Sequence, residues 1–177
     1  MQTIIEIEAG LAVPSKMSVI AAAKAMEDNP ALVEPIFNLA ISDRQPLSWR
    51  AAWVFAHMTD YQSVLLPALL PRIVKALLCL KNHSQRGCFF KVVSRSDFKV
   101  EEYGELLDFC IDILLKPTDR PSHKFYCLDL LEKFAIQIPE LKPELVMVVE
   151  EALPNFETDV LKRKGNKWLK RMEKNNR

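Results

Sequence analysis

The chain has 177 residues, 49% hydrophobic and 27% charged, which is the balance of an ordinary soluble globular protein. Its length suits one domain, since about 150 residues already bury roughly 70% of the unfolded chain's surface. The formal net charge of +1 argues against a dedicated nucleic-acid binder, because such domains usually carry a strong excess of Lys and Arg.

The charge is unevenly distributed along the chain. Residues 161–177 contain eight basic residues and one acidic residue, Glu173, so the rest of the chain carries a net charge of −6. An acidic body with a basic end can orient charged partners as they approach.

The cysteines and the N-terminal residues indicate the cellular compartment in which the protein is expected. The four cysteines lie in apolar stretches without a paired spacing, which favours free thiols in a reducing cytoplasm: Cys79, Cys88, Cys110 and Cys127. Residues 1–15 have no positively charged segment and include two glutamates, unlike a signal peptide. No stretch approaches about 18 uncharged apolar residues. We therefore expect a cytoplasmic protein without a membrane partner.

Apolar residues recur with a helical period, and no segment alternates long enough to predict a strand, so we predict an all-α protein. A short helix or an arm precedes Ser15. The helices that follow span about residues 15–28, 31–42, 48–58, 61–80, 84–94, 100–115, 122–136, 139–153 and 158–173. Ser15, Ser48 and Ser84 have side chains suited to a helix N-cap.

Residues 61–80 form the longest apolar run. Six residues in it fall on one helical stripe: Leu66, Leu69, Leu70, Ile73, Leu77 and Leu80. Pro67 and Pro71 cannot both occupy a regular helix interior, because each lacks the N–H that a helix needs. We expect a break or kink between Leu66 and Leu70.

The loops are short, so consecutive helices should be antiparallel neighbours. Aligning the shorter helices brings four cations into register at spacings of 36, 38 and 39 residues: Arg50, Arg86, Lys124 and Arg163, here called the basic ladder. A helical period near 40 residues is typical of a HEAT- or armadillo-type solenoid.

Two segments resemble the repeat of the HEAT family. Leu65–Leu70 (LLPALL) is similar to the family's Leu-rich first helix with its early proline. Trp49–Ala52 (WRAA) is similar to the start of its second helix, with Asp43 in the preceding turn. Weaker copies lie at residues 85–88, 123–126 and 161–164, so the resemblance covers roughly residues 30–174, about four repeats.

The resemblance and the period predict an all-α solenoid. We expect a right-handed superhelix of about four antiparallel helix-pair repeats with roughly 8–10 helices. Residues 1–177 are predicted to form a single domain: an N-terminal helical segment over 1–29, repeats over 30–156 and a basic capping helix over 157–177.

The basic ladder has two interpretations. In HEAT repeats this position often pairs with a turn aspartate, and Asp43 and Asp119 are placed to pair with Arg50 and Lys124. Alternatively, the four cations form a strip on the concave face that binds an acidic peptide or a phosphate backbone.

Trp49, Trp53 and His57 follow one another at i, i+4 and i+8, on one side of a predicted helix and beside Arg50. They either pack in the core or form an aromatic anchor for a partner, since Trp and Arg are the favoured anchors of binding sites. The candidate concave-face binding residues are therefore Trp49, Arg50, Trp53, His57, Arg86, Lys124 and Arg163.

Two further helices have a clear polar or apolar side. Four acids lie on one side of the 100–115 helix, which we interpret as a solvated outer face: Glu101, Glu105, Asp108 and Asp112. The last helix has an apolar line that we expect to dock on the preceding repeat as a cap: Leu161, Gly165, Trp168, Leu169 and Met172. The alternative for this helix is a phosphate-binding tail.

No catalytic chemistry is recognisable in the sequence. The histidines show no triad arrangement, the glycine-rich phosphate loops and HExxH are absent, and Cys79, His83 and Cys88 do not match a zinc spacing. We predict a non-enzymatic scaffold, without cofactor or metal, that binds a protein or peptide on its concave face.

Two alternatives remain open. The first is DNA or RNA binding, resembling the HEAT-like alkylated-DNA glycosylases, whose basic groove carries tryptophans and an aspartate. Trp49, Trp53 and Arg50 correspond loosely to that groove, and no motif places the aspartate. The second is self-association as a homodimer.

Overall fold

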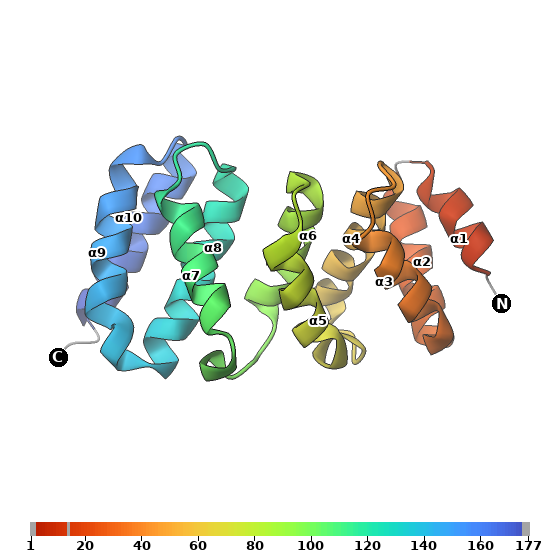
Figure 1. Cartoon of the computed structure of the whole chain (residues 1–177), viewed down its shortest axis with the longest axis horizontal. Helices are drawn as coiled ribbons and strands as arrows, with labels where there is room; N and C mark the ends of the chain where they lie inside the picture. The colour runs from red at the N-terminus through yellow and green to blue at the C-terminus, as the bar shows by residue number, and fades with distance from the viewer. Residues whose placement is uncertain (1–2, 14, 175–177) are drawn as a thin grey trace. The chain divides into compact units, whose positions relative to one another are not determined.

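The computed structural model describes residues 3–13 and 15–174, and these form helices joined by short turns, without strands (Figure 1). The α-helices are α1 (Ile4–Leu11), α2 (Lys16–Asp28), α3 (Val33–Ala40), α4 (Leu47–Met58), α5 (Leu66–Cys79), α6 (His83–Arg95), α7 (Gly104–Leu115), α8 (Pro121–Gln137), α9 (Lys142–Ala152) and α10 (Asp159–Lys174). Short 3-10 turns lie at Pro30–Leu32, Thr59–Tyr61, Val100–Glu102, Pro139–Leu141 and Leu153–Asn155. None of the described helices is long and apolar enough to cross a membrane.

The chain divides into two compact units, Met1–Ser96 and Asp97–Arg177, here called unit 1 and unit 2. Unit 1 contains three helix pairs, α1/α2, α3/α4 and α5/α6, and the two helices of each pair contact one another. The second helices form a layer in which α4 packs between α2 and α6. Unit 2 contains two pairs, α7/α8 and α9/α10, with α7 against α9 and α8 against α10.

The core of unit 1 centres on three phenylalanine rings from three helices. Phe37 of α3, Phe55 of α4 and Phe89 of α6 are all at most 2% exposed. Their centroids lie 5.8 to 6.3 Å apart, with Phe37 edge-on to Phe55 and stacked on Phe89. Such aromatic pairs add about 0.5–1.5 kcal/mol each beyond their area burial. We call these three residues the phenylalanine cluster.

The predicted helix starts are right in one case and wrong in two. Ser15 caps α2, because its hydroxyl accepts the N–H of Met17 at 3.2 Å. Asn82, not Ser84, caps α6 by accepting the N–H groups of Ser84 and Gln85. Ser48 lies inside the first turn of α4, fully buried, because the helix begins at Leu47.

The prolines of the long apolar run are accommodated differently from the prediction. The break falls before Leu66, where α5 begins, and Gln62 in the preceding turn adopts a left-handed conformation with φ 54°. Pro67 occupies the first turn, where a missing N–H costs nothing. Pro71 lies inside α5, which runs without a break from Leu66 to Cys79, so a break between Leu66 and Leu70 was wrong, and the alternative of a kink there stays a prediction. The predicted leucine stripe of α5 is buried as far as Leu77.

Unit 2 buries one face of its last helix. Along the predicted apolar line of α10, Leu161, Trp168 and Met172 are at most 2% exposed and Gly165 is buried. The helix packs against α8 and α9. The four predicted acids of the α7 side are all exposed, as expected for a solvated outer face.

The all-α, helix-pair architecture predicted from the sequence is confirmed. The segment before Ser15 contains the short helix α1, and each predicted helix corresponds to an observed one. The single domain over residues 1–177 and its subdivisions stay predictions.

Gly165 gives a test of how tightly α10 is docked. A Cβ at this position would lie 2.8 Å from Leu153 Cδ1 and 3.0 Å from Phe156 Cε2. Gly165→Leu should therefore lower the free energy of unfolding by about 1–3 kcal/mol through overpacking. Gly104→Leu is the matched control, because a Cβ at Gly104 meets nothing within 4 Å. Thermal unfolding followed by circular dichroism measures both, and equal melting temperatures would contradict close docking of α10.

Candidate binding surfaces

Trp49 and Trp53 form a stacked pair on α4, with ring centroids 5.9 Å apart and planes 19° from parallel. Both side chains are partly exposed, so neither the pure core interpretation nor a fully solvent-exposed anchor describes them. Because α4 lies between α2 and α6, the pair occupies the middle of the second-helix layer of unit 1. We call it the tryptophan pair.

Arg50 is held beside the tryptophan pair by the end of a distant helix. Its Nη1 donates to the carbonyl oxygens of Leu11 and Ala12, at 2.9 and 2.6 Å, where α1 ends. Its guanidinium lies 5.5 Å from the centroid of the Trp49 ring. The guanidinium does not form the expected ion pair with Asp43. It binds instead the C-terminal carbonyl groups of α1, which have no partner within that helix. Arg50 therefore fixes the position of α4 against α1.

Gln85 binds the carbonyl groups at the end of α3, as Arg50 binds those at the end of α1. It was not predicted from the sequence. Gln85 is 1% exposed on α6, and its Nε2 donates to the carbonyls of Ala40 and Ser42 at 2.7 and 3.0 Å. Its Oε1 accepts from Gln45 Nε2 at 2.8 Å. Gln85 is thus the counterpart of Arg50 in the next helix pair. The basic ladder aligned Arg50 with Arg86 instead, because the alignment followed positive charge.

Asp60 links the ends of α4 and α6. Its carboxylate lies 2.9 Å from Lys91 Nζ, 2.7 Å from Arg95 Nη1 and 3.4 Å from His57 Nδ1. Hydrogen bonds from Lys91 chiefly, and then from Arg95, hold the pKa of Asp60 below its usual value. A single carboxylate therefore contacts both cations of α6 near the C-terminal end of α4 and offsets one of their two positive charges.

The other members of the basic ladder lie in unlike environments. Arg86 and Lys124 are buried, at 9% and 2% exposure, whereas Arg163 is exposed on α10. Lys124 Nζ lies 5.9 Å from the Phe156 ring centroid, and burial lowers its pKa, opposed by the charges of Glu157 and Asp119. Of these three residues, only Arg163 is exposed to solvent, so the ladder positions do not share one kind of site.

Unit 2 contains a buried carboxylate–imidazole contact that sequence reasoning also missed. Asp119 Oδ1 lies 2.6 Å from His123 Nδ1 and accepts the backbone N–H of Arg120 at 2.8 Å. Both side chains are at most 4% exposed. The pair orders the first turn of α8, and the (i, i+4) spacing of Asp119 and His123 was the available signal.

The α8 and α10 faces of unit 2 are joined by ion pairs. Lys164 Nζ lies 2.6 Å from Asp129 Oδ1 and 3.3 Å from the Phe125 ring centroid, and Arg171 Nη2 lies 2.6 Å from Glu132 Oε2. Burial lowers the pKa of Lys164, and the hydrogen bond to Asp129 opposes this. Beside them, Phe125 and Val160 help to line a small hollow of about 280 Å³.

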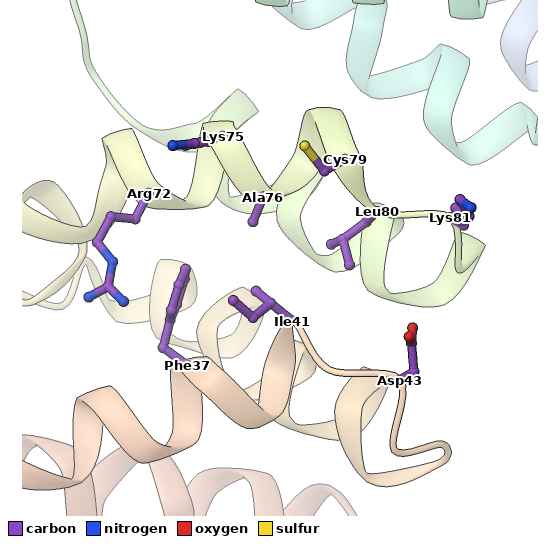
Figure 2. Close-up of a pocket in the computed structure, with 9 residues that line it drawn as sticks. All are labelled: Phe37, Ile41, Asp43, Arg72, Lys75, Ala76, Cys79, Leu80 and Lys81. Atoms are coloured by element: carbon purple, nitrogen blue, oxygen red, sulfur yellow. The ribbon is translucent and has the colours of Figure 1, made fainter.

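A larger groove of about 590 Å³ lies between α3 and α5 in unit 1 (Figure 2). Figure 2 shows the side chains of Arg72, Ala76 and Leu80 pointing toward Phe37 and Ile41 of the α3 end. Arg72 lies at one end of the groove, and Asp43 and Lys81 lie at the other. The lining is completed by Lys75 and Cys79. We call it the α3/α5 groove.

The groove exists because α3 and α5 do not pack closely together, unlike α7 and α9 in unit 2. Arg72 bridges the gap: it pairs with Glu34 of α3 through two hydrogen bonds of 2.6 and 2.9 Å and lies 4.4 Å over the Phe37 ring. None of the groove residues was predicted as a binding residue, because the separation of two helices cannot be read from their periodicity.

The sequence matches the family described as HEAT repeat domain over residues 8–172. The chain therefore belongs to the HEAT repeat family, a class of helical-repeat scaffolds that often mediate protein interactions. Searches among curated proteins and among solved structures found no match.

The buried amide of Gln85 can be tested with an isosteric change. Gln85→Glu removes the Nε2 donors and buries a carboxyl group whose pKa burial would raise above its unfolded value of about 4.3. The folded variant then binds the extra proton more tightly than the unfolded chain. Its stability therefore falls as pH rises from the unfolded pKa of the carboxyl group to the higher folded pKa. We expect a loss of about 2 kcal/mol or more at neutral pH, and less at about pH 4.

Gln85→Leu is the control for this pH effect, because it removes the same donors without adding a titratable group. Its stability loss, measured by urea unfolding across the same pH range, should not vary beyond that of the parent chain. A Gln85→Glu variant as stable as the parent at every pH would contradict the role assigned to the amide.

Thiol reactivity distinguishes the cysteines. Cys79 is exposed, Cys110 and Cys127 are buried, and burial raises the pKa of Cys88 to about 12. Since the thiolate is the reactive form, N-ethylmaleimide at about pH 8 should modify Cys79 well before the other three thiols, with Cys88 slowed by roughly a thousandfold or more. Cys79→Ser should abolish the fast phase in mass spectrometry, and four equally fast thiols would contradict the fold.

Proposed function

We propose that the chain is a non-enzymatic scaffold that binds a protein or peptide through the second-helix layer of unit 1, anchored on the tryptophan pair. The observation that carries the proposal is two stacked, partly exposed indole rings at the middle of a three-helix layer. Binding energy concentrates on Trp, Tyr and Arg near the centre of an interface, and a partner covering this helix layer would bury the pair near the centre of its contact.

The surroundings of the pair support this proposal because they are already ordered. Arg50 is bonded to two carbonyl groups, and Cys88 Sγ lies 4.0 Å from the carbonyl oxygen of Trp49. A partner therefore gains contact area without ordering these side chains, which lowers the entropic cost of association.

The same contacts weigh against the nucleic-acid alternative. Arg50, which lies beside the Trp49 ring, donates to two carbonyl oxygens, and Lys91 and Arg95 of the neighbouring helix α6 both contact Asp60. Phosphate binding requires several available cations and is strongest at low salt. Duplex DNA binding at low salt that weakens in Trp49→Ala would favour the alternative.

The location follows from the same proposal. The four cysteines are free thiols, two of them buried, which suits a reducing cytoplasm. We propose that the partner is met there.

The test compares partners captured from the source cell by the parent chain and by Trp49→Ala and Trp53→Ala variants, quantified by mass spectrometry. A protein anchored on the pair should be retained by the parent and lose affinity by about thirtyfold or more in each variant, as for a hot spot worth about 2 kcal/mol. Conservative Trp→Phe changes should retain part of the binding.

Val64→Ala is the matched control, because Val64 is an exposed apolar residue of unit 1 outside the pair, at 83% exposure. It should capture the same proteins as the parent. A partner set that both tryptophan variants retain in full, or no protein above an unrelated bait, would contradict the proposal.

A further inference from the structure

The α3/α5 groove is a second, separate surface of unit 1 that the proposed function does not use. We propose that it binds a short peptide segment of a partner protein that combines aliphatic side chains with carboxylates. The inference is independent of the tryptophan pair, which lies on α4 in the other helix layer.

The floor of the groove is apolar and already shaped. Phe37 is held by the phenylalanine cluster, while Ile41 keeps 38% exposure. Ala76 and Leu80 face them from the α5 side (Figure 2). The exposed Ile41 suits an aliphatic side chain of a ligand, because burying it gains about 25 cal/mol for each Å² of apolar surface.

The rim of the groove is predominantly cationic. Three basic residues, Arg72, Lys75 and Lys81, come from α5 and the residues that follow it, against one lining acid, Asp43. Glu34 neutralises part of the Arg72 charge, and Lys75 and Lys81 are exposed. The charge complementary to this rim is therefore negative, at one or two positions.

The dimensions favour a chain segment over a compact ligand. Residues 72–79, the part of α5 that lines the groove, advance by roughly 10 Å along the helix, and about three residues of an extended peptide cover the same distance. A ligand of this kind can place carboxylates near both ends of the groove and an aliphatic residue between them. Among the described residues, the groove is lined by α3, α5 and the segments that follow these two helices, so we expect that a longer polypeptide can enter and leave it without a free end.

Cys79 supplies a readout at the edge of the groove, because it contributes to the lining and is the exposed thiol among the four cysteines; Figure 2 shows its sulfur directed away from Phe37 and Ile41. A bound peptide should shield it. The experiment selects short random peptides, displayed on phage, against the full chain, and then measures how a synthetic copy of an enriched peptide changes the rate of N-ethylmaleimide modification at Cys79. The expected result is enrichment of Asp or Glu beside Leu, Ile or Phe, with a modification rate reduced by about tenfold at saturation.

Charge and shape are tested with matched pairs of variants. Lys75→Glu with Lys81→Glu should weaken the peptide by about tenfold or more, whereas Lys16→Glu with Lys24→Glu, the same change at exposed cations of α2, should leave its affinity unaltered. Ala76→Phe should block the groove, whereas Ala68→Phe, at an exposed position of the same helix outside the groove, should not. Circular dichroism confirms that each variant is folded.

Several results would overturn the proposal. The selection could enrich no peptide, or only peptides without carboxylates. The rate of Cys79 modification could stay unchanged when the peptide binds, or the α2 control variant could lose as much affinity for the peptide as the groove variant. Concentration-dependent dimerisation in light scattering that is lost in the Lys75→Glu and Lys81→Glu variant would instead assign the groove to a second copy of the chain. Loss of binding to the groove would leave capture through the tryptophan pair intact, so the two proposals fail separately.

Discussion

The phenylalanine cluster is the interaction on which both candidate surfaces of unit 1 depend. Phe37 presents its ring to the other two rings and also to the α3/α5 groove. Phe55 lies on α4, the helix that carries the tryptophan pair, and Phe89 follows Cys88 on α6. A void in this cluster would loosen three helices at once, since close-packed interiors transmit small changes in volume. The two surfaces are separate in location, but both rest on the packing of the phenylalanine cluster.

Polar contacts between neighbouring helix pairs repeat the period seen in the sequence. Arg44 pairs with Glu8 across 36 residues and Arg72 with Glu34 across 38 in unit 1, and Arg171 pairs with Glu132 across 39 in unit 2. As exposed or half-exposed pairs they contribute little stability individually. The contacts of Arg50 and Gln85 with helix-end carbonyls matter more, because a buried carbonyl without a donor costs about 1–3 kcal/mol.

The sequence predicted what depends on local periodicity and missed what depends on the distance between elements. The helices and the buried stripe of α5 follow from spacing alone. The cap at Asn82 was missed because Ser84, two residues later, is an equally good capping residue locally. The partner of Arg50 was missed because a helix end 39 residues away offers no charge to align. The groove follows from the separation of α3 and α5, which only their packing sets.

The lengths of chain enclosed by the Arg50 and Gln85 contacts are nearly equal, since Arg50 reaches back 39 residues to Leu11 and Gln85 reaches back 45 to Ala40. The entropic cost of closing a loop depends only on the logarithm of its length, so each helix pair of unit 1 is added at about the same cost. During synthesis on the ribosome, a pair can be fixed to its predecessor as soon as the first turn of its second helix has emerged. Unit 1 is therefore suited to growth in equal increments from the N-terminus, without waiting for residues still to be translated.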